Sequence, residues 1–180
     1  MTHYGATELA ASFRTVRRNT IQTAHDIPED KYDFSPAADC RTVAQTLVHI
    51  AFAPGIQMHV HTNGIDDLAK VPFMEIFQGI RAEEAKPRTK REIISLLESE
   101  GQKVASYFEG LSDAFLSQSV AMPPGSDPAT KNRLEMLLSP KEHEMHHRAQ
   151  LMVVQRMLGI TPHLTRQMME RMAQAQQPTP

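Results

Sequence analysis

Residues 139–151 read SPKEHEMHHRAQL, and this stretch indicates both the secondary structure and the chemistry of the chain. His143 and His147 are four residues apart, which places their imidazoles on one face of an α-helix. Both rings can then point at the same spot. The stretch therefore predicts a helix that presents two histidines side by side.

The face that carries these two histidines is otherwise apolar. At helical spacing it contains Met136, Pro140, Leu151, Val154 and Leu158. The face through His146 is polar over its first half, with Glu135, Ser139 and Glu142. We therefore expect His143 and His147 to point inward and His146 to lie nearer the edge. Two inward imidazoles are costly to bury unless they are satisfied, and a divalent metal ion satisfies them.

The rest of the chain also has helical periodicity. Prolines leave four long uninterrupted windows, at residues 1–27, 37–53, 88–122 and 141–161. Apolar residues in these windows recur three or four apart, and alternating strand patterns are nearly absent. Four main helices predict an all-α fold, an antiparallel four-helix bundle. We assign residues 1–165 to one bundle domain and residues 166–180, rich in glutamine and methionine, to a C-terminal tail.

Two of the helix starts have the spacing of a capping box. Thr89 and Glu92 open the third main helix in this way. Ser139 and Glu142 have the same spacing, with Pro140 at what we expect to be the first helical position. The connection at residues 63–87 contains Pro72, Gly79 and Pro87, and we expect it to hold a short helix.

Composition excludes several classes of protein. The 180 residues are 41% hydrophobic and 22% charged, which is typical of a globular domain and excludes a disordered chain. The net charge of −2 argues against a nucleic-acid-binding protein, which normally has excess Lys and Arg. No apolar run reaches the roughly 18 residues that span a bilayer, and no signal peptide is evident. The single cysteine, Cys40, is expected to be inert and packed, and the sequence predicts a cytoplasmic protein.

A third histidine lies in the second helical window. His49 stands in VAQTLVHIAF, residues 43–52, again among apolar neighbours. One histidine from this helix and two from the later one make a three-imidazole site for a divalent metal ion. Catalytic sites commonly have three protein ligands and an open position, whereas structural zinc usually has four ligands. Zinc, nickel and iron ions all accept imidazole ligands, so the sequence does not identify which metal is bound.

Together these elements resemble the DinB/YfiT-like superfamily of four-helix-bundle metalloenzymes, over about residues 5–162. The resemblance is carried by Leu-Val-His-Ile-Ala at residues 47–51 and by a histidine pair close to the family pattern H-x-x-x-H-R-G-Q. Ala149 stands where the family usually has glycine. The resemblance implies that the metal-binding histidines are His49, His143 and His147.

The resemblance also implies an activity. Characterised relatives include transferases and isomerases that use a low-molecular-weight thiol such as bacillithiol, mycothiol or glutathione, and homodimers are common among them. This implies a thiol or water activated by the metal, a small-molecule substrate and a homodimer, with no nucleic-acid or membrane partner. The alternative is a bundle protein that binds metal, or is connected with stress, without turnover.

Residues 143–147 also match H-E-x-x-H, the metallopeptidase motif in which the glutamate activates water. The chain has Gln150 and Val153 where the longer metzincin pattern requires glycine and histidine. It also lacks the strands that align a peptide substrate in such enzymes. Proteolysis is therefore the weakest alternative, and Glu144 is expected to be solvated or to support a ligand.

The sequence assigns no catalytic residue. Further candidates for substrate contacts are His59, His146 and Arg148. His59 and His61 lie near the end of the second predicted helix, and we expect them to be surface residues or, alternatively, to form a rim of the same pocket. Arg148 is suited to an anionic substrate or, equally, to an ion pair between helices.

Overall fold

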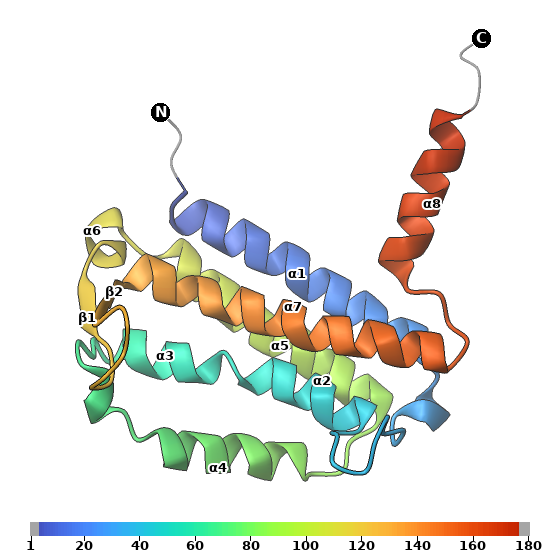
Figure 1. Cartoon of the computed structure of the whole chain (residues 1–180), viewed down its shortest axis with the longest axis horizontal. Helices are drawn as coiled ribbons and strands as arrows, with labels where there is room; N and C mark the ends of the chain where they lie inside the picture. The colour runs from blue at the N-terminus through green and yellow to red at the C-terminus, as the bar shows by residue number, and fades with distance from the viewer. Residues whose placement is uncertain (1–3, 177–180) are drawn as a thin grey trace.

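The computed structural model describes residues 4–176, which form a helical bundle with one small hairpin (Figure 1). The helices are α1 (Ala6–Asp26), α2 (Val43–Phe52), α3 (Gly55–Thr62), α4 (Phe73–Glu84), α5 (Lys90–Glu109), α6 (Asp113–Leu116), α7 (Arg133–Met157) and α8 (His163–Ala175). Short 3₁₀ turns at Glu29–Lys31 and Leu68–Lys70 and two antiparallel strands, β1 (Ser119–Ala121) and β2 (Thr130–Asn132), complete it. The predicted all-α class is confirmed.

Helices α1, α2, α5 and α7 make the four-helix bundle. α1 and α2 each pack against both α5 and α7. α1 and α7 run in one direction and α2 and α5 in the other, because the chain returns along α4 before α5 begins (Figure 1). The pairs α1–α5 and α2–α7 are therefore antiparallel. No helix within residues 4–176 is long and apolar enough to cross a membrane.

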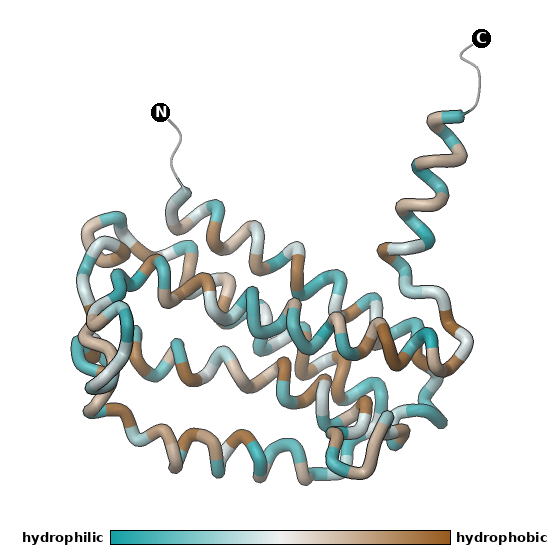
Figure 2. The backbone as a smooth tube through the Cα atoms, in the orientation of Figure 1, coloured by the Kyte–Doolittle hydropathy of each residue, from teal (hydrophilic) through white to brown (hydrophobic). Residues whose placement is uncertain are grey.

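Apolar side chains from all four helices fill the interior. Phe13 of α1, Leu47 of α2, Leu97 of α5 and Leu151 of α7 are almost completely buried. Hydrophobic positions recur along each of these helices, as the brown segments of Figure 2 show. Burial of this apolar surface is the main stabilising contribution to such a bundle. The core thus follows from the helical periodicity of the sequence.

The start of α7 differs from the sequence prediction. The helix begins at Arg133, and the Asn132 side chain caps it by accepting a hydrogen bond from the Glu135 amide (2.8 Å). Pro140 lies inside the helix, so Ser139 and Glu142 do not form its capping box. A proline inside a helix removes one backbone hydrogen bond but does not always end the helix. The box predicted at Thr89 and Glu92 is confirmed.

Two further segments outside the four bundle helices are helical. Residues 63–87 contain α4, a helix of 12 residues that packs against α2. Residues 163–175 form α8, which projects away from the bundle in Figure 1 and carries exposed methionines 168, 169 and 172. Part of the predicted C-terminal tail is thus helical. The domain boundary at residue 165 stays a prediction, and residues 177–180 lie outside the described residues.

A buried ion pair joins the four bundle helices. Arg17 of α1 and Glu144 of α7 are 4% and 1% exposed, and their Nη2 and Oε2 atoms lie 2.9 Å apart. Arg17 Nε also donates to both carboxylate oxygens of Glu144, at 3.0 Å each. Its remaining donors reach the carbonyl oxygens of Leu97 on α5 (2.7 Å) and Ile50 on α2 (3.2 Å). One guanidinium therefore contacts every helix of the bundle. Glu144 is buried and paired, so the expectation of a solvated glutamate was wrong.

Two local features make room for this guanidinium. Pro54 has no N–H to offer the Ile50 carbonyl four residues earlier, so that oxygen is free to accept from Arg17. Gly101 of α5 faces the Arg17 stem, and a Cβ there would lie 2.8 Å from Arg17 Cγ. Pro54 thus provides an acceptor for the buried Arg17 side chain, and Gly101 provides the space that it occupies.

Replacing Glu144 with Gln should destabilise the fold strongly. Arg17 would keep its charge in the interior without a counter-ion, which typically costs about 3–5 kcal/mol. Urea denaturation of Glu144→Gln beside Glu142→Gln, an exposed glutamate on the same helix, measures the difference. Equal free energies of unfolding for the two variants would contradict the role given to this pair.

Candidate metal centre

Three histidines from two facing helices, α2 and α7, meet between these helices. His49 is in the second half of α2, whose start is fixed by a capping box between Thr42 and Gln45. His143 and His147 lie one turn apart on α7. One ring nitrogen from each can be chosen so that all three lie within 4.8 Å of one another. The structure thus brings together the three residues that the sequence analysis proposed as metal ligands.

The ring nitrogens converge on a common point. His143 Nε2 lies 3.2 Å from His49 Nε2 and 3.2 Å from His147 Nε2. Two nitrogens bound to one tetrahedral zinc ion at about 2.0–2.1 Å are about 3.3–3.4 Å apart. The observed separations are close to that value. The group is therefore already spaced as a metal ion requires.

The outer nitrogens have partners that fix the rings. His49 Nδ1 lies 2.7 Å from Glu84 Oε1, and His147 Nδ1 lies 2.8 Å from Gln150 Oε1. Both partners are acceptors, so each Nδ1 carries the proton and each Nε2 presents a lone pair toward His143. The Nε2 lone pairs of His49 and His147 both point toward His143 Nε2. A single proton on that nitrogen cannot satisfy both acceptors fully. A cation at this point would satisfy them together, and the donor set fits a divalent metal.

The electrostatics of the site keep the imidazoles neutral. Burial, followed by the neighbouring charges of His147 and His49, lowers the pKa of His143 to about 4. Burial also lowers the pKa values of His49 and His147, with hydrogen bonds to Glu84 and Gln150 acting in the opposite direction. Metal binding requires deprotonated ligands. At neutral pH the three rings are therefore in the state that binds a metal.

Sequence reasoning missed Glu84 and Arg41. Glu84 is the last residue of α4, and its side chain is only 9% exposed. Its Oε1 holds His49, while its Oε2 accepts a hydrogen bond from Arg41 Nε (2.8 Å). A carboxylate behind a ligating histidine is a common support of metal sites. No local pattern pointed to it, because α4 lies in a stretch interpreted as a connection.

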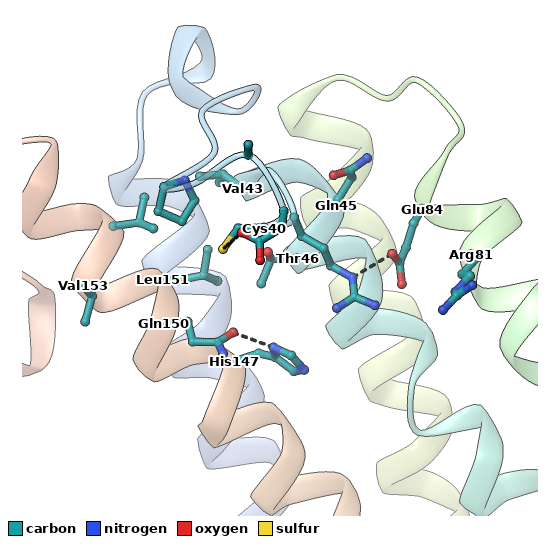
Figure 3. A pocket seen from close by; sticks show the side chains of 15 residues that line it. Cys40, Val43, Gln45, Thr46, Arg81, Glu84, His147, Gln150, Leu151 and Val153 are labelled. Atoms are coloured by element: carbon teal, nitrogen blue, oxygen red, sulfur yellow. Dashed lines mark hydrogen bonds and ion pairs between the residues drawn. The ribbon is translucent and has the colours of Figure 1, made fainter.

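A pocket of about 800 Å³ opens beside the histidines. Its walls come from the loop before α2 and from α2, α4 and α7, as Figure 3 shows. His147, Gln150 and Glu84 are part of the lining, so the pocket reaches the residues that form and support the centre. Its volume lies in the range of small-molecule sites, about 300–1,000 Å³. The centre is therefore accessible to a ligand.

The other candidate residues lie outside the three-histidine group. His146 is exposed, as expected, and its Nε2 lies 3.2 Å from Gln150 Nε2. His59 is on α3, partly buried, and is not among the lining residues of the pocket. Arg148 is 8% exposed and donates to the Val16 carbonyl of α1 (3.1 Å), so it faces α1 rather than the pocket. The substrate contact suggested for Arg148 does not fit this position.

The glutamate of the H-E-x-x-H match does not serve a metal. Glu144 follows His143 in sequence but points to the opposite side of α7, where both carboxylate oxygens bind Arg17. A water-activating glutamate must reach the metal-bound water, and this one is buried in an ion pair. The geometry of a zincin is therefore absent from α7.

Two further expectations were wrong. His61 is 2% exposed rather than on the surface, and Arg133 Nη1 donates to its Nδ1 (3.0 Å). Burial, followed by the charge of Arg133, lowers the pKa of His61 to about 4. Cys40 is exposed at the edge of the pocket rather than packed. Cys40 lies in the loop before α2 and His61 lies on α3, and neither was placed on an apolar helix face from which burial could be predicted.

A four-helix bundle with convergent histidines from facing helices defines a class, the helical bundles that hold a metal ion between their helices. Comparison with known families is more specific. The profile of the DinB family matches residues 1–178, so the chain belongs to the DinB family. A search of curated proteins gave no match.

Solved structures share the fold at low sequence identity. A DinB-like protein of Bacillus subtilis is 21% identical, with a TM-score of 0.63 and coverage of 86% of this chain and 94% of that one. YfiT of Bacillus subtilis, described as "a probable metal-dependent hydrolase with an unusual four-helix bundle topology", is 13% identical, with a TM-score of 0.67 and coverages of 89% and 91%. A DinB-like protein of Bacillus cereus is 15% identical, with a TM-score of 0.65 and coverages of 86% and 93%. These likenesses support the four-helix bundle.

Metal content should depend on histidines from both helices. We expect about one equivalent of divalent metal in the reconstituted wild-type protein and less than about one tenth of that in His49→Ala and His147→Ala, because each change removes one of three ligands. Elemental mass spectrometry measures this on untagged protein. His59→Ala, a histidine outside the group, is the matched control and should retain the metal. Full metal content in His49→Ala would contradict an interhelical site.

Proposed function

We propose that this DinB-family protein is a metal-dependent enzyme in which His49, His143 and His147 hold a divalent ion that activates a thiol or water. In its more specific form, the proposal is a thiol-dependent S-transferase or isomerase acting on a small electrophile. One observation carries the proposal: the three Nε2 atoms converge beside a pocket of about 800 Å³.

The residues around the centre have distinct tasks. Glu84 and Gln150 accept the Nδ1 protons of His49 and His147, which holds both rings in the ligating tautomer. Leu151 and Val154 give the pocket an apolar wall on α7 and limit the water that reaches the centre. A divalent metal ion, when bound, lowers the pKa of a coordinated thiol or water, so that a nucleophile is available at neutral pH.

The pocket and the ligand number favour turnover over a purely structural role. The group within residues 4–176 contains three side chains, whereas structural zinc usually has four protein ligands. A structural site is also normally closed, and this one adjoins a cavity. These two features support an enzyme over the non-catalytic alternative.

Hydrolysis is the second candidate function. The structural relative YfiT carries the description of a metal-dependent hydrolase, and a three-histidine site suits the activation of water as well as of a thiol. The same residues serve both reactions. The two candidates differ in whether turnover requires a thiol.

An activity screen with and without thiol separates the two candidates. We expect protein loaded with zinc, nickel or iron to accelerate the reaction of glutathione or a related cysteinyl thiol with a reactive small electrophile, such as 1-chloro-2,4-dinitrobenzene. His147→Ala should lower the metal-dependent rate by about 100-fold or more, because the centre no longer forms. The release of chromophore is followed by absorbance, with His59→Ala as control.

Each result of the screen has a definite meaning. Metal-dependent cleavage of a 4-nitrophenyl ester without thiol, and no thiol transfer, would replace the transferase with a hydrolase. Full metal content with neither activity across a broad panel of thiols and electrophiles would contradict an enzyme and favour a metal-binding bundle.

A further inference from the structure

The pocket beside the metal centre has two arginines on one wall and an apolar surface on another. Arg41 comes from the residue before the cap of α2, and Arg81 lies on α4, one turn before Glu84. Facing them are side chains of α2 and α7, including Val43, Leu151 and Val154. Figure 3 shows Arg81 and Glu84 on the same side of the cavity, and Arg41 is hydrogen-bonded to Glu84. A pocket of this kind suits a ligand with a charged end and an apolar body.

Glu84 holds Arg41 in place through one hydrogen bond, and within the described part of the chain other donors of the guanidinium remain free. Its Nε donates to Glu84 Oε2 at 2.8 Å, and its side chain remains 39% exposed. Within residues 4–176, its two Nη groups make no hydrogen bond to another residue. The other oxygen of the Glu84 carboxylate binds His49 Nδ1 at 2.7 Å, so one carboxylate joins this guanidinium to a histidine of the centre. It therefore offers fixed donors next to the centre.

The Arg81 side chain has no hydrogen-bond or ion-pair partner among residues 4–176 and is exposed at the pocket wall. The acidic side chains of the lining are Glu84 and Asp39. Glu84 already binds both His49 and Arg41, and Asp39 lies 3.9 Å from the Cys40 thiol in the loop before α2. Neither acid pairs with Arg81. A guanidinium without a partner at a pocket is a ready site for a carboxylate, which it can bind through two parallel hydrogen bonds.

The opposite wall of the pocket determines which chemical groups the remainder of the ligand can carry. Val43, Leu151, Val153 and Val154 line the cavity, and Val153, at 58% exposed, leaves the most apolar surface open to a ligand. Apolar surface gains free energy when it leaves water, so it favours an aliphatic or aromatic body rather than a second charged group. The volume of about 800 Å³ admits a molecule of drug-like size.

We propose that this pocket selects small organic acids, with the carboxylate on Arg41 and Arg81 and an apolar body against Val43, Leu151 and Val154. The inference rests on the proposed function, because it makes this acid the substrate or cosubstrate whose reacting atom lies beside the histidines. Arg41 and Arg81 are then the residues that bind the carboxylate, a role that metal binding by the three histidines does not require.

Isothermal titration calorimetry with a matched pair of probes tests the proposal. The probes are 4-phenylbutyrate and its neutral amide, 4-phenylbutanamide, titrated into zinc-loaded protein and into protein stripped of metal by a chelator. We expect the carboxylate to bind at least about tenfold more tightly than the amide in both preparations, since charged hydrogen bonds to arginine account for the preference. Arg81→Gln should reduce that preference to less than about threefold and leave amide binding unchanged.

Two further variants separate binding from support of the centre. Arg171→Gln, an exposed arginine on α8 outside the pocket, is the matched control and should keep the full preference. Arg41→Gln should also lose the preference, and its zinc content shows whether Glu84 and His49 still hold the metal. Arg41→Lys keeps the charge and should recover part of the preference.

The outcomes distinguish this inference from the proposed function. A preference that persists in Arg81→Gln and Arg41→Gln would overturn the arginine site, and its loss from the stripped protein would assign the carboxylate to the metal. Equal binding of acid and amide to wild-type protein would overturn it as well, while leaving the metal centre in place. Failure to bind zinc, with the preference intact in stripped protein, would instead contradict the proposed function and keep the acid-binding pocket.

Discussion

The buried contact between Arg17 and Glu144 is the constraint on which the arrangement of this bundle depends. A charge pair taken out of water tolerates little displacement, because an unpaired charge in the interior is far more costly than a shifted apolar side chain. Arg17 also binds carbonyl oxygens on α2 and α5, so the position of each helix along its axis is tied to the others. Glu144 adjoins His143, and Ile50 adjoins His49. The pair that joins the helices therefore also brings the three imidazoles to one point.

Helix α7 divides its two functions between opposite faces. His143 and His147 face His49 of α2, and His147 also lines the pocket, while Glu144 and Arg148 face α1, where both side chains are bound. A match to H-E-x-x-H therefore has a different meaning here than in a peptidase. The glutamate positions the helix that carries the histidines, and the support of the ligands falls to Glu84 and Gln150.

Much of the fold and of the centre could be predicted because the relevant signals are local. The spacing of His143 and His147 fixes their common face, and the apolar setting of His49 suggests that it points inward. Ser139, Pro140 and Glu142 suggested a helix start because a capping box is recognised from only four residues. The helix in fact begins at Arg133 and continues through Pro140. Glu84 and Arg41 could not be found, since both lie in segments whose path depends on the whole tertiary structure. Arg17 was likewise one of several arginines on α1, and only the packed bundle shows which one is buried.

X-ray absorption spectroscopy at the metal edge of the zinc-loaded protein tests the three-imidazole centre most directly. Our account predicts three imidazole nitrogens at about 2.0–2.1 Å, together with oxygen from solvent in the remaining coordination, and no sulfur. In a His49→Ala sample, the metal that still binds should show one imidazole fewer. A wild-type spectrum with a sulfur ligand, or with two imidazoles or fewer, would contradict the centre described here.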